Sequence, residues 1–298
     1  MAEAITVAAT GRRVGPRRWR LAAFARDRAA LAALIVLVLV IGACAAAPLI
    51  SSVGPYAAND ALRYVAPLTH GYLLGTDEQG RDELARLLWG GRVSLAVGVL
   101  PTLGASAIGL ALGILAGIFR GFVDTIVMRS LDVLFAFPIV LFAIALAGAM
   151  TPGIGTEMLA IMIILVPYLG RLARTATLSV MSMPYIEAAR AAGGSPLAIA
   201  LRYVFPNVLS PILVYATTLM GLMIVVGSGL SFLGLGVQPP TADWGAMVAQ
   251  GRVVLATAPH VTLIPGIAIL LVSLAFNFLG DGVRDALDPR TARRVDVR

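Results

Sequence analysis

Few residues in this chain could take part in chemistry, and most of them are far apart. A single cysteine, Cys44, excludes a disulfide framework or a thiolate metal site within one chain. The two histidines, His70 and His260, are distant in sequence, and nothing supports a metal site at either. All 23 basic residues are arginine, so the chain has no lysine for a nucleotide-binding P-loop or a Schiff base. The sequence therefore predicts no catalytic residue, no metal site and no cofactor bound by this chain.

The segment GSGLSFLGLG (227–236) has the composition of a dinucleotide-binding or nucleophile motif but not the spacing. It lacks the third glycine of the dinucleotide motif, no alternation of strands and helices surrounds it, and no G-x-S-x-G occurs. Small residues near a helix end either line a polar path or permit close helix packing, and the sequence leaves both interpretations open. The candidate path residues are Thr217, Thr218, Ser228 and Ser231.

Acidic residues within the apolar runs are rare. An intramembrane acid such as Asp132 is a candidate for proton or ion coupling, but Arg129, three residues earlier, favours a local ion pair at the interface. Glu157 is expected in the first turn of a helix, where the helix dipole stabilises an acid. In the polar segment before the second apolar run, Asp82 and Arg86 are spaced for a helical pair worth about 0.2–0.5 kcal/mol.

The stretch YIEAARAAGGSPLAIALRYVFPN (185–207) is helical in pattern but charged and interrupted. Pro184 predicts the start of a helix, and Glu187 then falls in the first turn, where the dipole favours it. The alanines in this stretch have the highest helix propensity and give the helix small side chains. Gly193 and Gly194 predict its end, since glycine suits the left-handed position after a helix.

A second short helix is predicted directly after this break. Ser195 is expected to cap it, with Pro196 at its first position, and the helix is expected to end near Phe205, before Pro206. Ten residues cover ~15 Å, which is too short to span a bilayer. It either lies on the membrane surface or fits a groove on a cytoplasmic partner. Its apolar stripe comprises Leu197, Ala200, Leu201 and Val204.

The residues discussed above are separated by long apolar runs, and the elements that these runs form must position them. The chain is 59% hydrophobic and 13% charged, with a mean hydropathy of +0.89, which indicates a polytopic all-α membrane protein. The first run is too long for a signal-peptide core, so we expect an uncleaved span. The six predicted spans cover 29–50, 93–119, about 125–156, 158 to beyond Arg171 and Arg174, 209–231, and about 262–283, with external loops at 51–92 and 232–261.

Arginine placement predicts the orientation. With a cytoplasmic N-terminus, eighteen of the 23 arginines fall inside, and both termini are cytoplasmic. The basic segment 1–28 and the tail 284–298 then lie inside, next to anionic lipid, so the net charge of +7 does not imply nucleic-acid binding. Residues 93–283 are expected to form a five-helix core. Its second span carries a ladder of small residues that favours packing within the chain over packing against a partner subunit: Gly109, Gly113, Gly117 and Gly121.

Several stretches resemble one known family. Glu187-Ala188-Ala189 followed by Gly193 is similar to the EAA loop of permease subunits in bacterial ATP-binding-cassette (ABC) importers. The resemblance covers roughly residues 19–290 and is closest to the C-type subunits of the dipeptide, oligopeptide and nickel branch. Ala198 and Ala200 stand where more polar residues are typical of that branch. The matching stretches are LLGTDEQGRDELARLLWGGRVSLAVG (73–98), LSFLGLGVQPPTADWGAMVAQGR (230–252) and LAFNFLGDGVRDALDPR (274–290).

The resemblance implies a type I importer permease in the bacterial cytoplasmic membrane that carries peptides. It implies a homologous permease as partner, two cytoplasmic ATPases on which ATP and Mg act, and an external substrate-binding protein that selects the substrate. The EAA loop would be the helix that docks on an ATPase. The coupling residues that it implies are Glu187, Ala188, Ala189, Gly193, Ser195, Leu197, Leu201 and Pro206.

Two other classes compete with this interpretation. An ion-coupled secondary transporter would act without an ATPase and would need acidic relays in mid-membrane, which only Asp132 approaches. An intramembrane enzyme would need paired catalytic groups, and the spans contain no Ser-His pair, His-Glu motif or paired carboxylates. Both alternatives are therefore less favoured than an importer permease.

Overall fold

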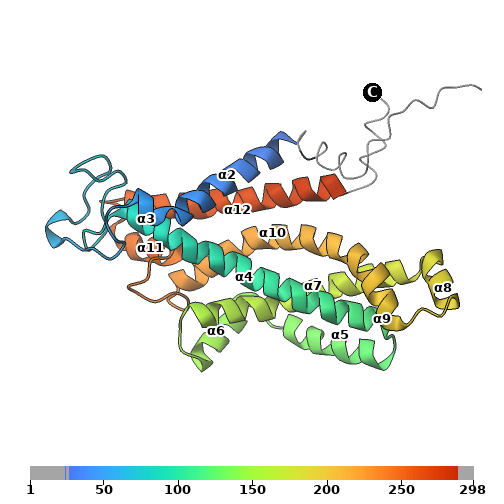
Figure 1. The fold of residues 1–298 in the computed structure, drawn as a ribbon. Helices are drawn as coiled ribbons and strands as arrows, with labels where there is room; N and C mark the ends of the chain where they lie inside the picture. The colour runs from blue at the N-terminus through green and yellow to red at the C-terminus, as the bar shows by residue number, and fades with distance from the viewer. Residues whose placement is uncertain (1–23, 25–26, 288–298) are drawn as a thin grey trace, which may run out of the picture.

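The computed structural model describes residue 24 and residues 27–287 of the 298-residue chain. The basic segment 1–28 and the tail 284–298, both predicted to be cytoplasmic, therefore lie mostly outside the described residues. Within the described range the chain is a bundle of helices without a β-strand, which confirms the all-α prediction (Figure 1).

Five helices of the described chain are long and apolar enough to cross a membrane, and a bent helix pair makes a sixth when its two halves are counted as one span. The first predicted span consists of α2 with the short α3, and the described bundle is completed by α4, α7, α10 and α12. Their bounds are Arg28–Ala45 for α2, Ala47–Ile50 for α3, Glu83–Ile118 for α4, Ile154–Met181 for α7, Phe205–Phe232 for α10 and His260–Leu287 for α12.

The prediction of one continuous third span is wrong. The segment forms two helices, α5 (Phe122–Phe135) and α6 (Ile139–Ala149), whose axes differ by 90°. Pro138 lies at the break as the N-cap of α6. Proline has no N–H to donate and disfavours the helical conformation of the residue before it, so the chain turns there.

The fourth span is better formed than its short apolar run indicated. Helix α7 continues through Arg171 and Arg174, which confirms that the span extends beyond these charges. Glu157 lies in the first turn of α7, also as predicted.

The glycine ladder of α4 packs inside this chain, against α7. A Cβ placed on Gly109 would come within 2.8 Å of the Gly170 nitrogen, and one on Gly117 within 2.4 Å of Thr177 Cγ2. Gly113 makes a similar approach, and helices come this close only where one side lacks a side chain. Gly121 is not part of the ladder, because it has a φ of +86° and forms the N-cap of α5.

The helices place two sets of connections at opposite ends of the bundle. Figure 1 shows α3, α11 (Trp244–Gly251) and the polar segment 51–82 at one end, and α8 (Pro184–Ala191) with α9 (Pro196–Ile199) at the other. Gly280 of α12 packs against Thr218 of α10, and Gly282 against Ala30 of α2. Figure 1 also shows the start of α2 and the end of α12 directed toward the α8–α9 end.

The two predicted external loops are more structured than expected. Helix α4 begins at Glu83, ten residues before the predicted span, because the Asp82 carboxylate accepts a hydrogen bond from the Leu84 N–H as N-cap. In the second loop, α11 folds back into the bundle. Trp244 is 1% exposed and donates its indole N–H to the Leu87 carbonyl oxygen at 2.9 Å.

Candidate functional site

Helix α8 and its break have the local structure that the sequence predicts. Pro184 is the first residue of α8, and Glu187 lies in its first turn. After the helix, the Gly193 N–H donates to the Arg190 carbonyl oxygen at 2.9 Å and the Gly194 N–H to that of Ala189 at 3.0 Å. This pair of bonds is a Schellman motif, and it requires the left-handed φ of +83° that Gly193 adopts.

Two buried side chains hold the α8–α9 segment (residues 184–204) against the bundle, and a ring contact braces the segment internally. Ile186 of α8 and Ile199 of α9 are both buried in the larger hydrophobic core. The rings of Tyr185 and Tyr203 also face each other, with centroids 6.2 Å apart. The segment is therefore a braced element of the fold, and it presents a defined surface at the end of the bundle.

That surface includes the residues predicted to couple to a partner. Glu187 and Ala188 are exposed, and Ala189 is half-buried. The Ser195 hydroxyl accepts a hydrogen bond from the Ala198 N–H at 3.2 Å, so Ser195 caps α9 as predicted. The remaining members of the predicted set, Leu197, Leu201 and Pro206, are exposed.

The prediction that the second helix ends before Pro206 is wrong. Helix α9 continues through a π-helical turn, η2 (Ala200–Val204), into α10, and Pro196–Phe232 form one helix of 37 residues. The Phe205 N–H bonds the Ala200 carbonyl oxygen, five residues earlier. The wider turn relieves the clash that a proline ring makes in a regular α-helix, so the chain passes Pro206 without a break.

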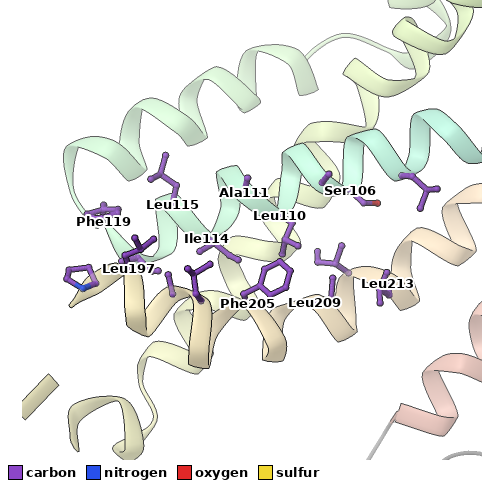
Figure 2. Close-up of a pocket in the computed structure, with 17 residues that line it drawn as sticks. Ser106, Leu110, Ala111, Ile114, Leu115, Phe119, Leu197, Phe205, Leu209 and Leu213 are labelled. Carbon is purple, nitrogen blue, oxygen red and sulfur yellow. The ribbon is translucent and has the colours of Figure 1, made fainter. Parts of the chain in front are cut away.

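The apolar stripe of α9 faces α4 across a groove of about 620 Å³. Figure 2 shows Leu197 and Phe205 on one side of this groove and Phe119 on the other. The Ser106 hydroxyl lies on the α4 side and donates to the Thr102 carbonyl oxygen at 2.6 Å. Val204, which was expected in the same stripe, is instead fully buried in the core.

The four candidate path residues lie on α10 in different surroundings. Thr217 is half-buried and donates to the Leu213 carbonyl oxygen at 2.9 Å, whereas Thr218 packs against Gly280. Ser228 and Ser231 are buried against α11 and α7. The fold therefore buries Ser228 and Ser231 inside this chain and leaves Thr217 and Thr218 half-buried, and the role of all four in a path stays a prediction.

The end opposite α8–α9 contains a buried ion-pair cluster that the sequence did not reveal. The expected Asp82–Arg86 pair is absent from the described residues because Asp82 caps α4. Arg86, 1% exposed, pairs instead with Asp77 and donates to Gln250 Oε1 at 2.8 Å. Arg81 Nε donates to Asp77 Oδ2 at 2.6 Å.

Electrostatics explain why Asp77 is charged in this buried place. Burial alone would raise the pKa of Asp77, but Arg86, the backbone N–H groups of Arg81 and Gln79, and the Arg81 guanidinium together lower it below its usual value. A lowered carboxyl pKa stabilises the folded chain above the unfolded-state pKa, and this contribution is lost as the pH falls through the folded-state value. The cluster thereby fastens residues 51–82 to α4 and α11.

Two further buried acids lie close to this end. Asp243 caps α11 and accepts from the Ser94 hydroxyl at 2.6 Å. Burial raises the pKa of Asp243, and hydrogen bonds from Ser94 and from the Ala246 N–H offset this in part. Glu157 is 2% exposed and accepts from the Ser231 hydroxyl at 3.4 Å.

Ion pairs between α5 and α7 form a second feature that sequence reasoning missed. The expected local pair of Asp132 with Arg129 is long, at 4.0 Å, whereas Arg171 Nη2 donates to Asp132 Oδ1 at 2.7 Å. Arg174 binds both carboxylate oxygens of Asp124 at 2.5 Å. The partners are 39 and 50 residues apart in sequence, so only helix packing brings them together.

Taken together, the described residues form a bundle of membrane-length helices with a braced helical segment at one end, the architecture of a multi-pass membrane protein. The family model described as "Binding-protein-dependent transport system inner membrane component" matches residues 109–293. A second, described as "N-terminal TM domain of oligopeptide transport permease C", matches residues 17–67. The chain belongs to this family of bacterial inner-membrane ABC permeases, within its peptide and oligopeptide branch.

Known relatives are similar in sequence to this chain over most of its length. A glutathione transport system permease protein of Escherichia coli is 43% identical over 278 residues, which cover 91% of this chain and 89% of the relative. A putative peptide transport system permease protein of Brucella abortus is 40% identical over 266 residues, with 89% of each chain covered. A solved chain of the MetNI methionine ABC transporter in an inward-facing conformation has a TM-score of 0.56 at 18% identity. It covers 68% of this chain and 96% of its own, which confirms the type I importer permease fold.

Proposed function

We propose that this chain is one of two homologous permease subunits of an ATP-driven importer, and that it forms half of a translocation path for peptides. One of two cytoplasmic ATPases, on which ATP and Mg act, would dock on the α8–α9 segment, and an external binding protein would deliver the substrate. The names of the relatives, which specify glutathione and peptide transport, support this substrate class.

The continuity of α9 with α10 carries the proposal. A partner that binds the exposed surface around Glu187 and Leu197 contacts the start of the helix that ends at Phe232. Displacement of α9 is therefore transmitted along the backbone into a membrane span, with no loop between them. This is the connection that a subunit needs if an ATPase is to drive it.

Charge supports a cytoplasmic α8–α9 end. Most arginines at the opposite end are engaged in ion pairs: Arg81 and Arg86 pair with Asp77, and Arg63 pairs with Asp60, whereas Arg252 is exposed and lies over the Phe232 ring. Arg92 donates to two carbonyl oxygens at the end of α2. Arg120, Arg190 and Arg202, near the α8–α9 end, are exposed, and exposed arginines favour the cytoplasmic side.

Cross-linking and transport test the proposal together. Cys44 is buried, so a Glu187→Cys variant supplies one exposed thiol in this chain. We expect this thiol to cross-link to a co-expressed ATPase subunit, and we expect the reconstituted complex to take up peptide only with ATP and binding protein. Ion-driven peptide uptake by the purified chain alone would instead establish a secondary transporter.

A further inference from the structure

A polar pocket lies between α5 and α7, apart from the α8–α9 segment. It has a volume of about 350 Å³, at the lower end of the range for small-molecule sites. We call it the α5–α7 pocket. Its lining residues are Met128, Asp132, Arg171, Arg174 and Thr175.

The two ion pairs at this pocket differ in how many hydrogen-bonding groups they leave free to bind a ligand. Arg174 and Asp124 bind each other through two hydrogen bonds, and the Asp124 side chain is only 18% exposed. Arg171 gives Asp132 a single hydrogen bond, and their side chains are 39% and 46% exposed. A guanidinium has five N–H donors and a carboxylate about four acceptor sites, so Arg171 and Asp132 both retain binding capacity.

The exposed charge of Arg171 lies within a membrane-length helix, which limits what can surround it. Arg171 lies ten residues before Met181, the end of α7, which places it ~15 Å from that end along the helix. Charged side chains within spanning helices face a bundle interior or a water-filled cavity, because exposure to lipid is costly. The guanidinium also lies over the Phe135 ring, 4.0 Å from its centroid, which fixes its position.

We propose that Asp132 and Arg171 bind the two charged ends of a short peptide in the α8–α9 half of the path. The peptide carboxylate accepts hydrogen bonds from the free N–H groups of Arg171, and the peptide ammonium donates to Asp132. A positive and a negative group side by side in one pocket match a zwitterion, whereas a purely anionic ligand would be repelled by Asp132. This inference rests on the proposed function, which it extends from a substrate class to a contact site.

A thiol placed in the pocket gives a direct test in the reconstituted complex. Thr175 is exposed and lines the pocket, so Thr175→Cys introduces a reactive group there, while Cys44 is 4% exposed. Labelling of this chain by a water-soluble maleimide is followed by mass spectrometry. The probes are dialanine, dialanine amide and N-acetyl-dialanine. We expect dialanine to slow labelling, and either blocked form to need about ten-fold or more higher concentration.

A second substitution in the same chain tests which residue binds which end of the peptide. In the Thr175→Cys background, Arg171→Gln should abolish the difference between dialanine and its amide, and Asp132→Asn the difference between dialanine and its acetylated form. The matched control is Arg120→Gln, which removes an exposed arginine near the α8–α9 end that does not line the pocket. This variant should keep both differences.

Other outcomes overturn the inference. Equal protection by blocked and free dialanine, or equal loss in the Arg120→Gln control, shows that the pocket does not recognise peptide ends. Protection by inorganic phosphate or anionic-lipid vesicles as strong as that by dialanine indicates a general anion site. ATP-dependent uptake by the complex with the unsubstituted chain is measured in parallel, so uptake by that complex without protection of the Thr175→Cys thiol refutes only this inference. Absence of ATP-dependent uptake by the complex with the unsubstituted chain refutes the proposed function itself.

Discussion

Gly113 of α4 and Ala173 of α7 are in direct contact along the most extensive helix pair of the bundle. A Cβ on Gly113 would come within 2.4 Å of the Ala173 Cβ and within 2.6 Å of the Gly170 carbonyl oxygen. Backbone atoms on α7 cannot move aside for one side chain, so this contact sets the distance between α4 and α7. The two helices thereby form a rigid unit in which both run in the same direction.

Replacing Gly113 with alanine should separate these helices. We expect Gly113→Ala to destabilise the protein by about 1–3 kcal/mol, the usual cost of overpacking. The apparent melting temperature of the purified protein in detergent measures this. Gly155→Ala, on the same helix pair but with nothing within 4 Å of the added Cβ, is the control and should leave the melting temperature nearly unchanged.

The break between α8 and α9 should depend on the left-handed backbone of Gly193. Gly193→Ala forces a side chain into a φ of +83°, which costs about 1–2 kcal/mol. We expect the α8–α9 surface to distort and the ratio of peptide taken up to ATP hydrolysed to fall. Gly193→Asn should retain more of this ratio, since asparagine tolerates the left-handed region. Equal losses in both variants would contradict a conformational cause.

Glu187 should matter for coupling but not for folding. Because the Glu187 side chain is exposed, Glu187→Ala should change the free energy of unfolding by at most about 0.5 kcal/mol, so the melting temperature should stay nearly the same. ATP-dependent uptake by the reconstituted complex should nevertheless drop several-fold, while ATP hydrolysis continues. The control is Asp60→Ala, which removes an exposed acid at the opposite end of the bundle. Normal uptake by the Glu187 variant would refute the coupling role.

Arg86 should be among the most sensitive positions for stability. Arg86→Met leaves Asp77 buried with one guanidinium partner fewer, and breaking a buried pair costs about 3–5 kcal/mol. Arg63→Met breaks a similar pair with Asp60 that is exposed, so it should cost at most about 1 kcal/mol. Thermal unfolding of both variants in detergent separates the two cases, and equal shifts would show that burial is not the cause.

Asp243 should make stability depend on pH in the opposite sense to Asp77. Its folded-state pKa is raised by burial, so the folded chain binds the proton more tightly than the unfolded chain. Stability from this group therefore increases as the pH falls through the folded-state pKa and is complete below the unfolded value. Asp243→Asn should gain stability relative to the original protein at pH 8 and lose that advantage toward pH 4. A difference in melting temperature that stays constant with pH would contradict this.

Local signals in the sequence were enough to predict the α8–α9 break. Pro184, Gly193 and Ser195 act on backbone groups within a few residues, so their positions alone determine where the helices start and stop. The same local reasoning failed at Pro206. Whether a proline ends a helix depends on whether the preceding turn widens, and here a π-helical turn supported by packing of the buried Val204 does so.

The side-chain partners were not predictable from spacing. Asp132 had an obvious neighbour in Arg129, but it is 4.0 Å away and the shorter bond is to Arg171; Arg86 had a neighbour in Asp82, yet it pairs with Asp77. Their partners come from another helix or from a turn nine residues away, and such choices depend on the three-dimensional packing. The glycine ladder shows the intermediate case, because its spacing predicted a close helix contact but could not identify α7 as the partner.

The helix from Pro196 to Phe232 is also held at one point along its length. At 1.5 Å per residue it is about 55 Å long, and the tight contact of Gly221 with α12 lies about two-thirds of the way along it. The π-helical turn η2 and Pro211 lie between α9 and this contact, and both are places where helices bend. A push on α9 is therefore divided between bending at these two places and movement of α10 against α12.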